Sequence, residues 1–263
     1  MSLIITVWTT EGIVMGSDSR ISFSSQIIPS VPFNIQTGHY FDTQEKTFIC
    51  PNNCGISTCG DASLNNKNIT GYIYDYINTN VTVNTSVLDT ANNLMNFILS
   101  IDPKTEIHFI VAGYEKNGNQ KIQAVYEIIT GNNKRIRSIT NNGFGAKWDG
   151  ETDTITRILK AHYICTKNPI ESPQLININT TSGPIDVNNA IVFQKHEIIK
   201  FNENMIDWNF MTLQDAIDFV RYAINTTIDT MRFTNVNKTV GGPIDILVIT
   251  PKQAKWIAHK ELH

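Results

Sequence analysis

Residues 3–20 read LIITVWTTEGIVMGSDSR, which is two apolar runs separated by a short polar turn. Both runs are rich in β-branched side chains, and a glycine lies between them where the chain can reverse its direction. The pattern predicts an antiparallel β-hairpin over residues 3–8 and 13–16. Because neither run alternates apolar with polar residues, both strands should be buried on both faces. The second strand leads directly into two charged residues, Asp18 and Arg20.

Length and composition indicate a globular protein with a sizeable core. The chain has 263 residues, of which 41% are hydrophobic, and it carries a net charge of −3. Its largest basic cluster is residues 134–137, far less than the basic face of a nucleic-acid-binding protein. No apolar run approaches the roughly 18 residues of a membrane span, and the N-terminus lacks the charged and apolar regions of a secretory signal. We therefore expect a soluble, cytoplasmic protein that binds neither nucleic acid nor membranes.

Three of the four cysteines, Cys50, Cys54 and Cys59, lie close together in the sequence. Their C-x3-C-x4-C spacing differs from the C-x2-C pairs of zinc sites, and no histidine is near them in the sequence. Extracellular disulfide scaffolds are shorter and have a higher density of cysteines. We therefore predict buried structural thiols, with no metal site and no other cofactor.

The rest of the chain shows a mixed pattern of strands and helices. A polar, proline-containing loop is predicted over residues 22–40. Strands are predicted at 46–50, 54–59, 107–112, 122–129, 135–140, 190–193 and 244–250. Helices are predicted at 64–78, 86–100, 151–165 and 212–231. This order indicates an α+β fold with two sheets between helix layers, in one domain over residues 1–263 with a less readable insertion at about 167–211.

Motifs of several common catalytic sites are missing from the sequence. It contains no Gly-x-Ser-x-Gly, no P-loop and no G-x-G-x-x-G. What remains is polarity at the edges of apolar strands: Asp18 and Arg20 follow the second hairpin strand, and Lys46 opens the next strand. Taken alone, these residues are typical of a strand-end ion pair with a solvated lysine beside it. A functional interpretation needs further evidence.

Several stretches of the chain resemble the β-type subunits of the proteasome. Residues 12–20 are similar to the opening hairpin of that family, whose second strand ends in an Asp-x-Arg signature. Residues 46–49 and 55–62 are similar to its lysine strand and to the glycine turn into its first helix. Residues 228–232 and 240–246 look most like the bacterial branch called Anbu. The resemblance spans nearly the whole chain and implies the four-layer αββα sandwich of N-terminal nucleophile hydrolases.

The resemblance implies a peptidase whose nucleophile is the first residue of the mature chain. Counting back from Asp18 without gaps places that position on Ser2, which removal of Met1 would expose. A free α-amine has an unperturbed pKa of roughly 7.7–8.0 and can accept the hydroxyl proton near neutral pH. By the same resemblance, peptides or unfolded proteins are the substrates, and identical subunits assemble into a ring or an open helical ring.

The resemblance also assigns roles to the charged residues beside the hairpin. Lys46 would lower the pKa of the hydroxyl and stabilise developing negative charge, and Asp18 would keep that lysine charged and oriented. The backbone N–H of Gly60, at the strand-to-helix turn, would bind the oxyanion. Arg20 would support this arrangement.

Three positions depart from the family pattern. Phe144 stands where a serine is usual, Asn237 lies near a usual aspartate, and Val240 replaces a serine or threonine before Gly241. These departures favour a second hypothesis, a proteasome-like scaffold with little or no peptidase activity. A third hypothesis is related chemistry on another substrate, such as hydrolysis of a small amide or transpeptidation.

Overall fold

The computed structural model describes residues 2–23, 39–140, 143–159, 162–165, 197–200 and 206–261. The chain divides into two compact units, one of residues 1–155 with 207–263 and the other of residues 156–206. Most of the predicted insertion at 167–211, including the strand predicted at 190–193, lies outside the described residues. The predicted single domain with an insertion therefore stays a prediction.

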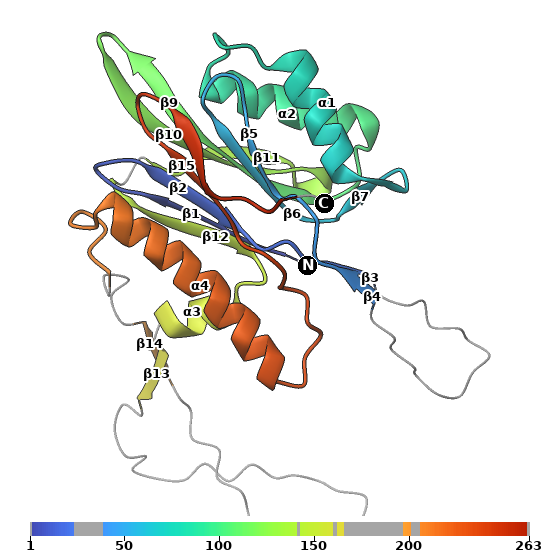
Figure 1. The fold of residues 1–263 in the computed structure, drawn as a ribbon, viewed down its shortest axis with the longest axis vertical. Helices are drawn as coiled ribbons and strands as arrows, with labels where there is room; N and C mark the ends of the chain where they lie inside the picture. Colours follow the sequence, from blue (N-terminus) through green and yellow to red (C-terminus); the bar gives the residue numbers. More distant parts are fainter. Residues whose placement is uncertain are drawn as a thin grey trace, which may run out of the picture. The chain divides into compact units, whose positions relative to one another are not determined.

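The larger unit contains two five-stranded antiparallel sheets (Figure 1). The first sheet has the order β12-β1-β2-β15-β16, with the bounds β1 (Leu3–Trp8), β2 (Ile13–Ser17), β12 (Gly145–Gly150), β15 (Asp245–Ile249) and β16 (Ala254–Ala258). The second sheet has the order β11-β10-β9-β6-β5, with the bounds β5 (Thr47–Ile49), β6 (Gly55–Gly60), β9 (Ile107–Asn117), β10 (Gln120–Ile129) and β11 (Arg135–Ser138). A short 3-10 turn (Gly131–Asn133) joins β10 to β11.

The predicted N-terminal hairpin is confirmed. β1 and β2 pair antiparallel, and every residue of both strands is buried. Side chains of this hairpin, such as Ile4 and Met15, pack against Ile110 and Val125 of the second sheet. One apolar core therefore lies between the two sheets.

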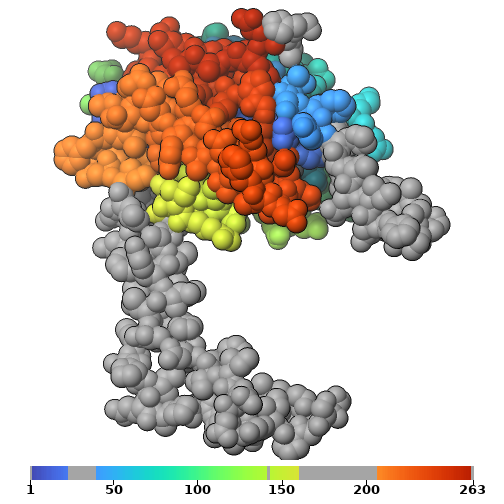
Figure 2. Space-filling view, turned by 60° about the horizontal axis from the view of Figure 1, so that its bottom comes forward, coloured from blue at the N-terminus to red at the C-terminus, as the bar shows by residue number. Residues whose placement is uncertain are grey.

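Helices cover the outer faces of both sheets (Figure 1). Helices α1 (Ile69–Asn80) and α2 (Val87–Ile101) pack over the second sheet and share an apolar core with it. Helix α4 (Leu213–Phe233) packs on the first sheet, and Figure 2 shows its other face at the molecular surface. The predicted α+β class with antiparallel sheets is confirmed. No helix among the described residues is long and apolar enough to cross a bilayer.

Side chains close the starts of the predicted helices. The Ser86 hydroxyl accepts a hydrogen bond from the Asp89 N–H at the start of α2. Thr212 and Asp215 form a reciprocal capping box at the start of α4. Each cap satisfies N–H groups that the first helical turn leaves without partners, which explains why these two boundaries were predicted well.

Several predicted boundaries were wrong. The first helix begins at Ile69 rather than residue 64, because β7 (Ser63–Leu64) and β8 (Lys67–Asn68) form a short ribbon through Asn65 and Asn66, both at positive φ. The helix predicted at 151–165 stops early. It is α3 (Asp153–Leu159), and β13 (His162–Cys165) instead pairs with β14 (Glu197–Lys200).

Four further strands were not predicted. In the predicted loop, β3 (Ile21–Phe23) pairs with β4 (His39–Phe41), and residues 24–38 lie outside the described residues. The other two, β12 and β16, lie at the two edges of the first sheet. Both edge strands are only partly buried, so their sequences lack the continuous apolar run that marks β1 and β2.

Candidate active site

Asp18 lies just beyond the end of β2, with its carboxylate fully buried. Its Oδ1 accepts hydrogen bonds from the Leu3 N–H at 3.0 Å and from Lys46 Nζ at 2.7 Å. Its Oδ2 accepts from the N–H groups of Arg20 at 3.1 Å and Gly241 at 3.0 Å. Three backbone amides and one ammonium therefore fix this carboxylate in position.

Lys46 is almost completely buried, with 3% of its surface exposed. Its ammonium donates to Asp18 Oδ1 and, at 2.6 Å, to the Arg20 carbonyl oxygen. Burial lowers the pKa of Lys46 below its ordinary value, although the neighbouring Asp18 charge opposes that shift. An ammonium has three N–H donors, and these two hydrogen bonds use two of them. Lys46 also lines a pocket.

Ser2, Lys46 and Gly60 line one pocket of about 130 Å³. Ser2 is buried at the start of β1, and its carbonyl oxygen accepts a hydrogen bond from the Glu151 N–H at 2.7 Å. Gly60 ends β6 with φ of +99°, a backbone conformation that favours glycine. Three of the four predicted catalytic residues therefore line one pocket. The fourth, Asp18, is not among the lining residues and forms an ion pair with Lys46. Their catalytic roles stay predictions.

Arg20 contacts Asp18 and Lys46 through its backbone, while its side chain has other partners. The guanidinium forms two hydrogen bonds of 2.7 Å with Asp42 and stacks over the Tyr40 ring at 3.8 Å. The hydrogen bond to Asp42 raises the pKa of Arg20. Sequence reasoning missed Asp42, because its spacing from Arg20 shows no pattern.

Gly241 and Gly242 pack closely against Arg20 and Asp42. A Cβ at Gly241 would lie 2.4 Å from Arg20 Cζ, and one at Gly242 would lie 2.9 Å from the Asp42 carbonyl oxygen. Gly242 also has a φ of +75°, which favours glycine. The same loop brings the Gly241 N–H to the Asp18 carboxylate.

The residues that depart from the family pattern lie in different surroundings. Phe144 packs against the apolar core between the sheets, and Val240 is buried. Asn237 is exposed, but the nearby Thr239 hydroxyl donates to Glu151 Oε2 at 3.4 Å. Because the Glu151 N–H also bonds the Ser2 carbonyl, Thr239 and Glu151 support the start of β1. Sequence reasoning missed both residues.

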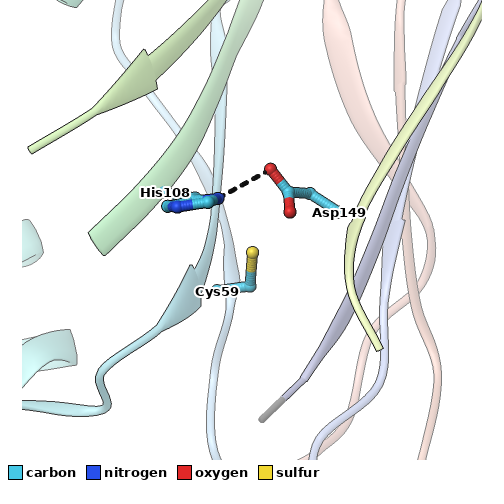
Figure 3. A group of neighbouring side chains, drawn as sticks. All are labelled: Cys59, His108 and Asp149. Atoms are coloured by element: carbon cyan, nitrogen blue, oxygen red, sulfur yellow. Dashed lines mark hydrogen bonds and ion pairs between the residues drawn. The ribbon is translucent and has the colours of Figure 1, made fainter. Parts of the chain in front are cut away.

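A second cluster, Cys59, His108 and Asp149, was also missed. Figure 3 shows the three side chains pointing toward one another, with His108 Nδ1 2.9 Å from Asp149 Oδ2. Cys59 faces His108 directly across the β6–β9 pairing. No local spacing could have indicated the cluster, because its members are separated by dozens of residues in the sequence.

Comparison with known proteins bears on the fold. No protein-family model matches the chain, and no curated protein matches it. Among solved structures, the chain is similar to Anbu (ancestral beta-subunit) from Yersinia bercovieri, with a TM-score of 0.53 and 12% sequence identity. The similarity covers 98% of this chain and 88% of that one. The chain therefore shares the fold of this ancestral β-subunit, which confirms at the level of the fold the resemblance to the Anbu branch of proteasome β-type proteins.

Proposed function

We propose that this protein is a peptidase whose nucleophile is the hydroxyl of Ser2, exposed as the N-terminal residue once Met1 is removed. The observation that carries the proposal is that Lys46 lines the same pocket as Ser2, while Asp18 holds the Lys46 ammonium at 2.7 Å. As the family resemblance implies, the substrates are peptides or unfolded proteins in the cytoplasm. Identical subunits assemble into a ring or an open helical ring.

Cleavage begins with a proton transfer within Ser2 itself. The free α-amine accepts the hydroxyl proton as the oxygen attacks the carbonyl carbon of the scissile peptide. The Lys46 ammonium stabilises the negative charge that develops on the serine oxygen, since a nearby opposite charge favours the ionised form. Asp18 keeps the ammonium in place, because its carboxylate is itself held by three backbone amides.

The tetrahedral intermediate then collapses to an ester on Ser2. The Gly60 N–H donates a hydrogen bond to the oxyanion, and this donor is preorganised because it belongs to the backbone at the end of β6. The protonated α-amine returns its proton to the leaving amine. A water molecule, activated by the same amine, hydrolyses the ester and releases the second product, so the cycle needs no cofactor.

Covalent labelling tests the nucleophile. Protein whose intact mass shows that it begins at Ser2 should be labelled by a peptide epoxyketone or boronate, which react with hydroxyl nucleophiles. Ser2→Ala should abolish labelling, and so should retention of Met1, because the Ser2 nitrogen is then an amide. Thr10→Ala, which removes an exposed hydroxyl from the β1–β2 turn, should keep it. Labelling that persists in Ser2→Ala would place the nucleophile elsewhere.

The alternative function is a proteasome-like scaffold with little or no peptidase activity. The observation that favours it is Phe144, which packs into the core between the sheets where the family usually has a serine. Native-sequence protein that retains Met1, or Ser2-terminal protein that no hydroxyl-directed probe labels, would support the scaffold.

A further inference from the structure

Cys59, His108 and Asp149 bring three different metal-ligating groups to one point. A thiol sulfur, an imidazole nitrogen and a carboxylate oxygen all lie within 4.8 Å of one another. Cys59 and His108 come from adjacent strands of the second sheet, and Asp149 comes from β12 of the first. Figure 3 shows the three groups facing the space between the sheets.

We propose that this cluster binds a zinc ion, which bridges the two sheets beside the Ser2 pocket. Zinc takes thiolate, imidazole and carboxylate ligands at about 2.0–2.3 Å, so tetrahedral geometry places the ligand atoms roughly 3.3–3.6 Å apart. Small rotations of the three side chains reach that spacing, with the ion replacing the direct bond from His108 Nδ1 to Asp149 Oδ2. Three protein ligands leave the fourth position open to water.

Neighbouring groups already orient two of the ligands. His108 Nε2 lies 3.4 Å from Glu106 Oε1, and Asp149 Oδ1 accepts a hydrogen bond from the Gly150 N–H at 2.7 Å. These contacts leave Nδ1 and Oδ2 to face Cys59 and the ion. Such carboxylate–histidine and carboxylate–amide contacts are typical second partners of metal ligands.

A cysteine nucleophile fits the cluster less well than a metal. The base of a catalytic triad must present one ring nitrogen to the thiol and the other to the carboxylate. In Figure 3 the ring nitrogen of His108 that faces the other two side chains is the one that bonds Asp149. The other nitrogen, Nε2, lies 3.4 Å from Glu106 Oε1. Cys59 is also only 4% exposed, unlike a reactive thiol.

The ion has a route to the site. Cys59 lines the pocket that Ser2 and Lys46 also line, while the side chains of His108 and Asp149 are partly exposed. The sequence spacing of the cysteines indicated no metal, because the partners of Cys59 come from β9 and β12 rather than from Cys50 or Cys54. This proposal does not depend on the nucleophile assigned above.

Cobalt substitution tests the site in the full chain. Protein freed of metal by a chelator and titrated with Co²⁺ should develop a thiolate-to-cobalt charge-transfer band and the visible bands of tetrahedral cobalt. Zn²⁺ should remove both, and should raise the Tm of the metal-free protein. Cys59→Ser should abolish the charge-transfer band. Cys50→Ala is the matched control, because Cys50 is equally buried at 4% exposure but lies outside the cluster, and it should keep the band.

Asp149→Asn keeps the test decisive if Cys59→Ser does not fold. The substitution preserves the shape of a partly exposed side chain, and it should weaken Zn²⁺ binding and abolish the Zn²⁺-dependent rise in Tm. Glu106→Gln should lower zinc affinity by about 10–100-fold, as expected for the partner of a ligating histidine. Wild-type protein without the charge-transfer band, or folded Asp149→Asn with unchanged zinc affinity, would overturn the proposal.

Discussion

Two buried carboxylates, Asp18 and Glu127, each hold a lysine ammonium at nearly the same distance. Lys46 lies 2.7 Å from Asp18, and Lys147 lies 2.6 Å from Glu127. Both carboxylates are almost fully buried, at 0% and 2% exposure of their side chains. The two ion pairs therefore look equivalent until their other partners are compared.

The backbone makes the difference between them. Asp18 also accepts hydrogen bonds from three backbone N–H groups, and Lys46 is buried beside it. The further partners of Glu127 are the side chains of Arg135 and Arg137, which are 55% and 60% exposed. Arg137 approaches Glu127 Oε2 at 2.8 Å without hydrogen-bonding geometry, so this contact is electrostatic only. The Asp18–Lys46 pair is therefore held by backbone donors inside the protein, whereas the further partners of Glu127 are flexible, exposed side chains.

The largest effect should come from neutralising Asp18, and the same change at Glu127 provides the comparison. Asp18→Asn leaves Lys46 charged, buried and unpaired, and it should lower the free energy of unfolding by about 3–5 kcal/mol. Glu127→Gln should lower it by about 1 kcal/mol, because Arg135 and Arg137 are exposed and Lys147 is partly exposed, so that water solvates all three cations. Equilibrium unfolding in urea measures both. Equal losses would show that the backbone amides around Asp18 add nothing.

The next effect compares the two lysines in catalysis and rests on the proposed function. Lys46→Ala should lower peptide turnover by at least ~100-fold, or about 2.7 kcal/mol in the activation barrier. Lys147→Ala should leave turnover unchanged. The stability loss of Lys46→Ala should be modest, since Asp18 keeps its three backbone donors. Similar turnover in the two variants would remove Lys46 from the mechanism.

A smaller effect concerns the glycine beside Ser2. A Cβ at Gly150 would lie 1.9 Å from the Ser2 carbonyl oxygen, whereas one at Gly118 meets nothing within 4 Å. Both glycines have positive φ, at +89° and +61°. Gly118→Ala should therefore lower the free energy of unfolding by about 1–2 kcal/mol, the cost of backbone strain alone, and the variant should keep wild-type peptide turnover.

Gly150→Ala should lower the free energy of unfolding by more than Gly118→Ala does. It should also lower peptide turnover, because the new Cβ displaces Ser2. Thermal unfolding and peptide hydrolysis, measured on both variants, separate the two effects. If Gly150→Ala behaves like Gly118→Ala, the position of Ser2 does not depend on β12.

The smallest effect is a pH dependence. The proposed mechanism needs the Lys46 ammonium, and burial lowers the pKa of Lys46 below its ordinary value of 10.5. Activity should therefore fall as pH rises through that lowered pKa, which puts the alkaline limb of kcat/KM below pH 10.5. Over the same window the unfolded chain binds more protons at this lysine, so its contribution to stability rises with pH. An alkaline limb at or above 10.5 would contradict the assignment.

Local patterns in the sequence were sufficient for the centre of the fold. The apolar runs of the N-terminal hairpin predicted β1 and β2, and the caps at Ser86 and Thr212 marked the starts of α2 and α4. The order of these elements, with the resemblance at residues 12–20 and 46–62, was enough to predict the α+β fold and to select Ser2, Lys46 and Gly60, which line one pocket. These predictions succeeded because hydrophobic periodicity, capping and turn chemistry act over only a few residues.

The tertiary structure alone decided which distant residues meet. The sequence predicted the strand at whose start Lys46 lies, and the structure begins that strand, β5, one residue later. Only the fold shows that the amides of Leu3 and Gly241 hold its partner Asp18. The Arg20–Asp42 pair and the Cys59–His108–Asp149 cluster depend on strand register, loop closure and the packing of one sheet on another. Edge strands β12 and β16 were missed for a related reason, since a half-buried strand is recognisable only once its neighbour is in place. Burial and pairing across the sheets are properties of the assembled chain, and no local window of sequence contains them.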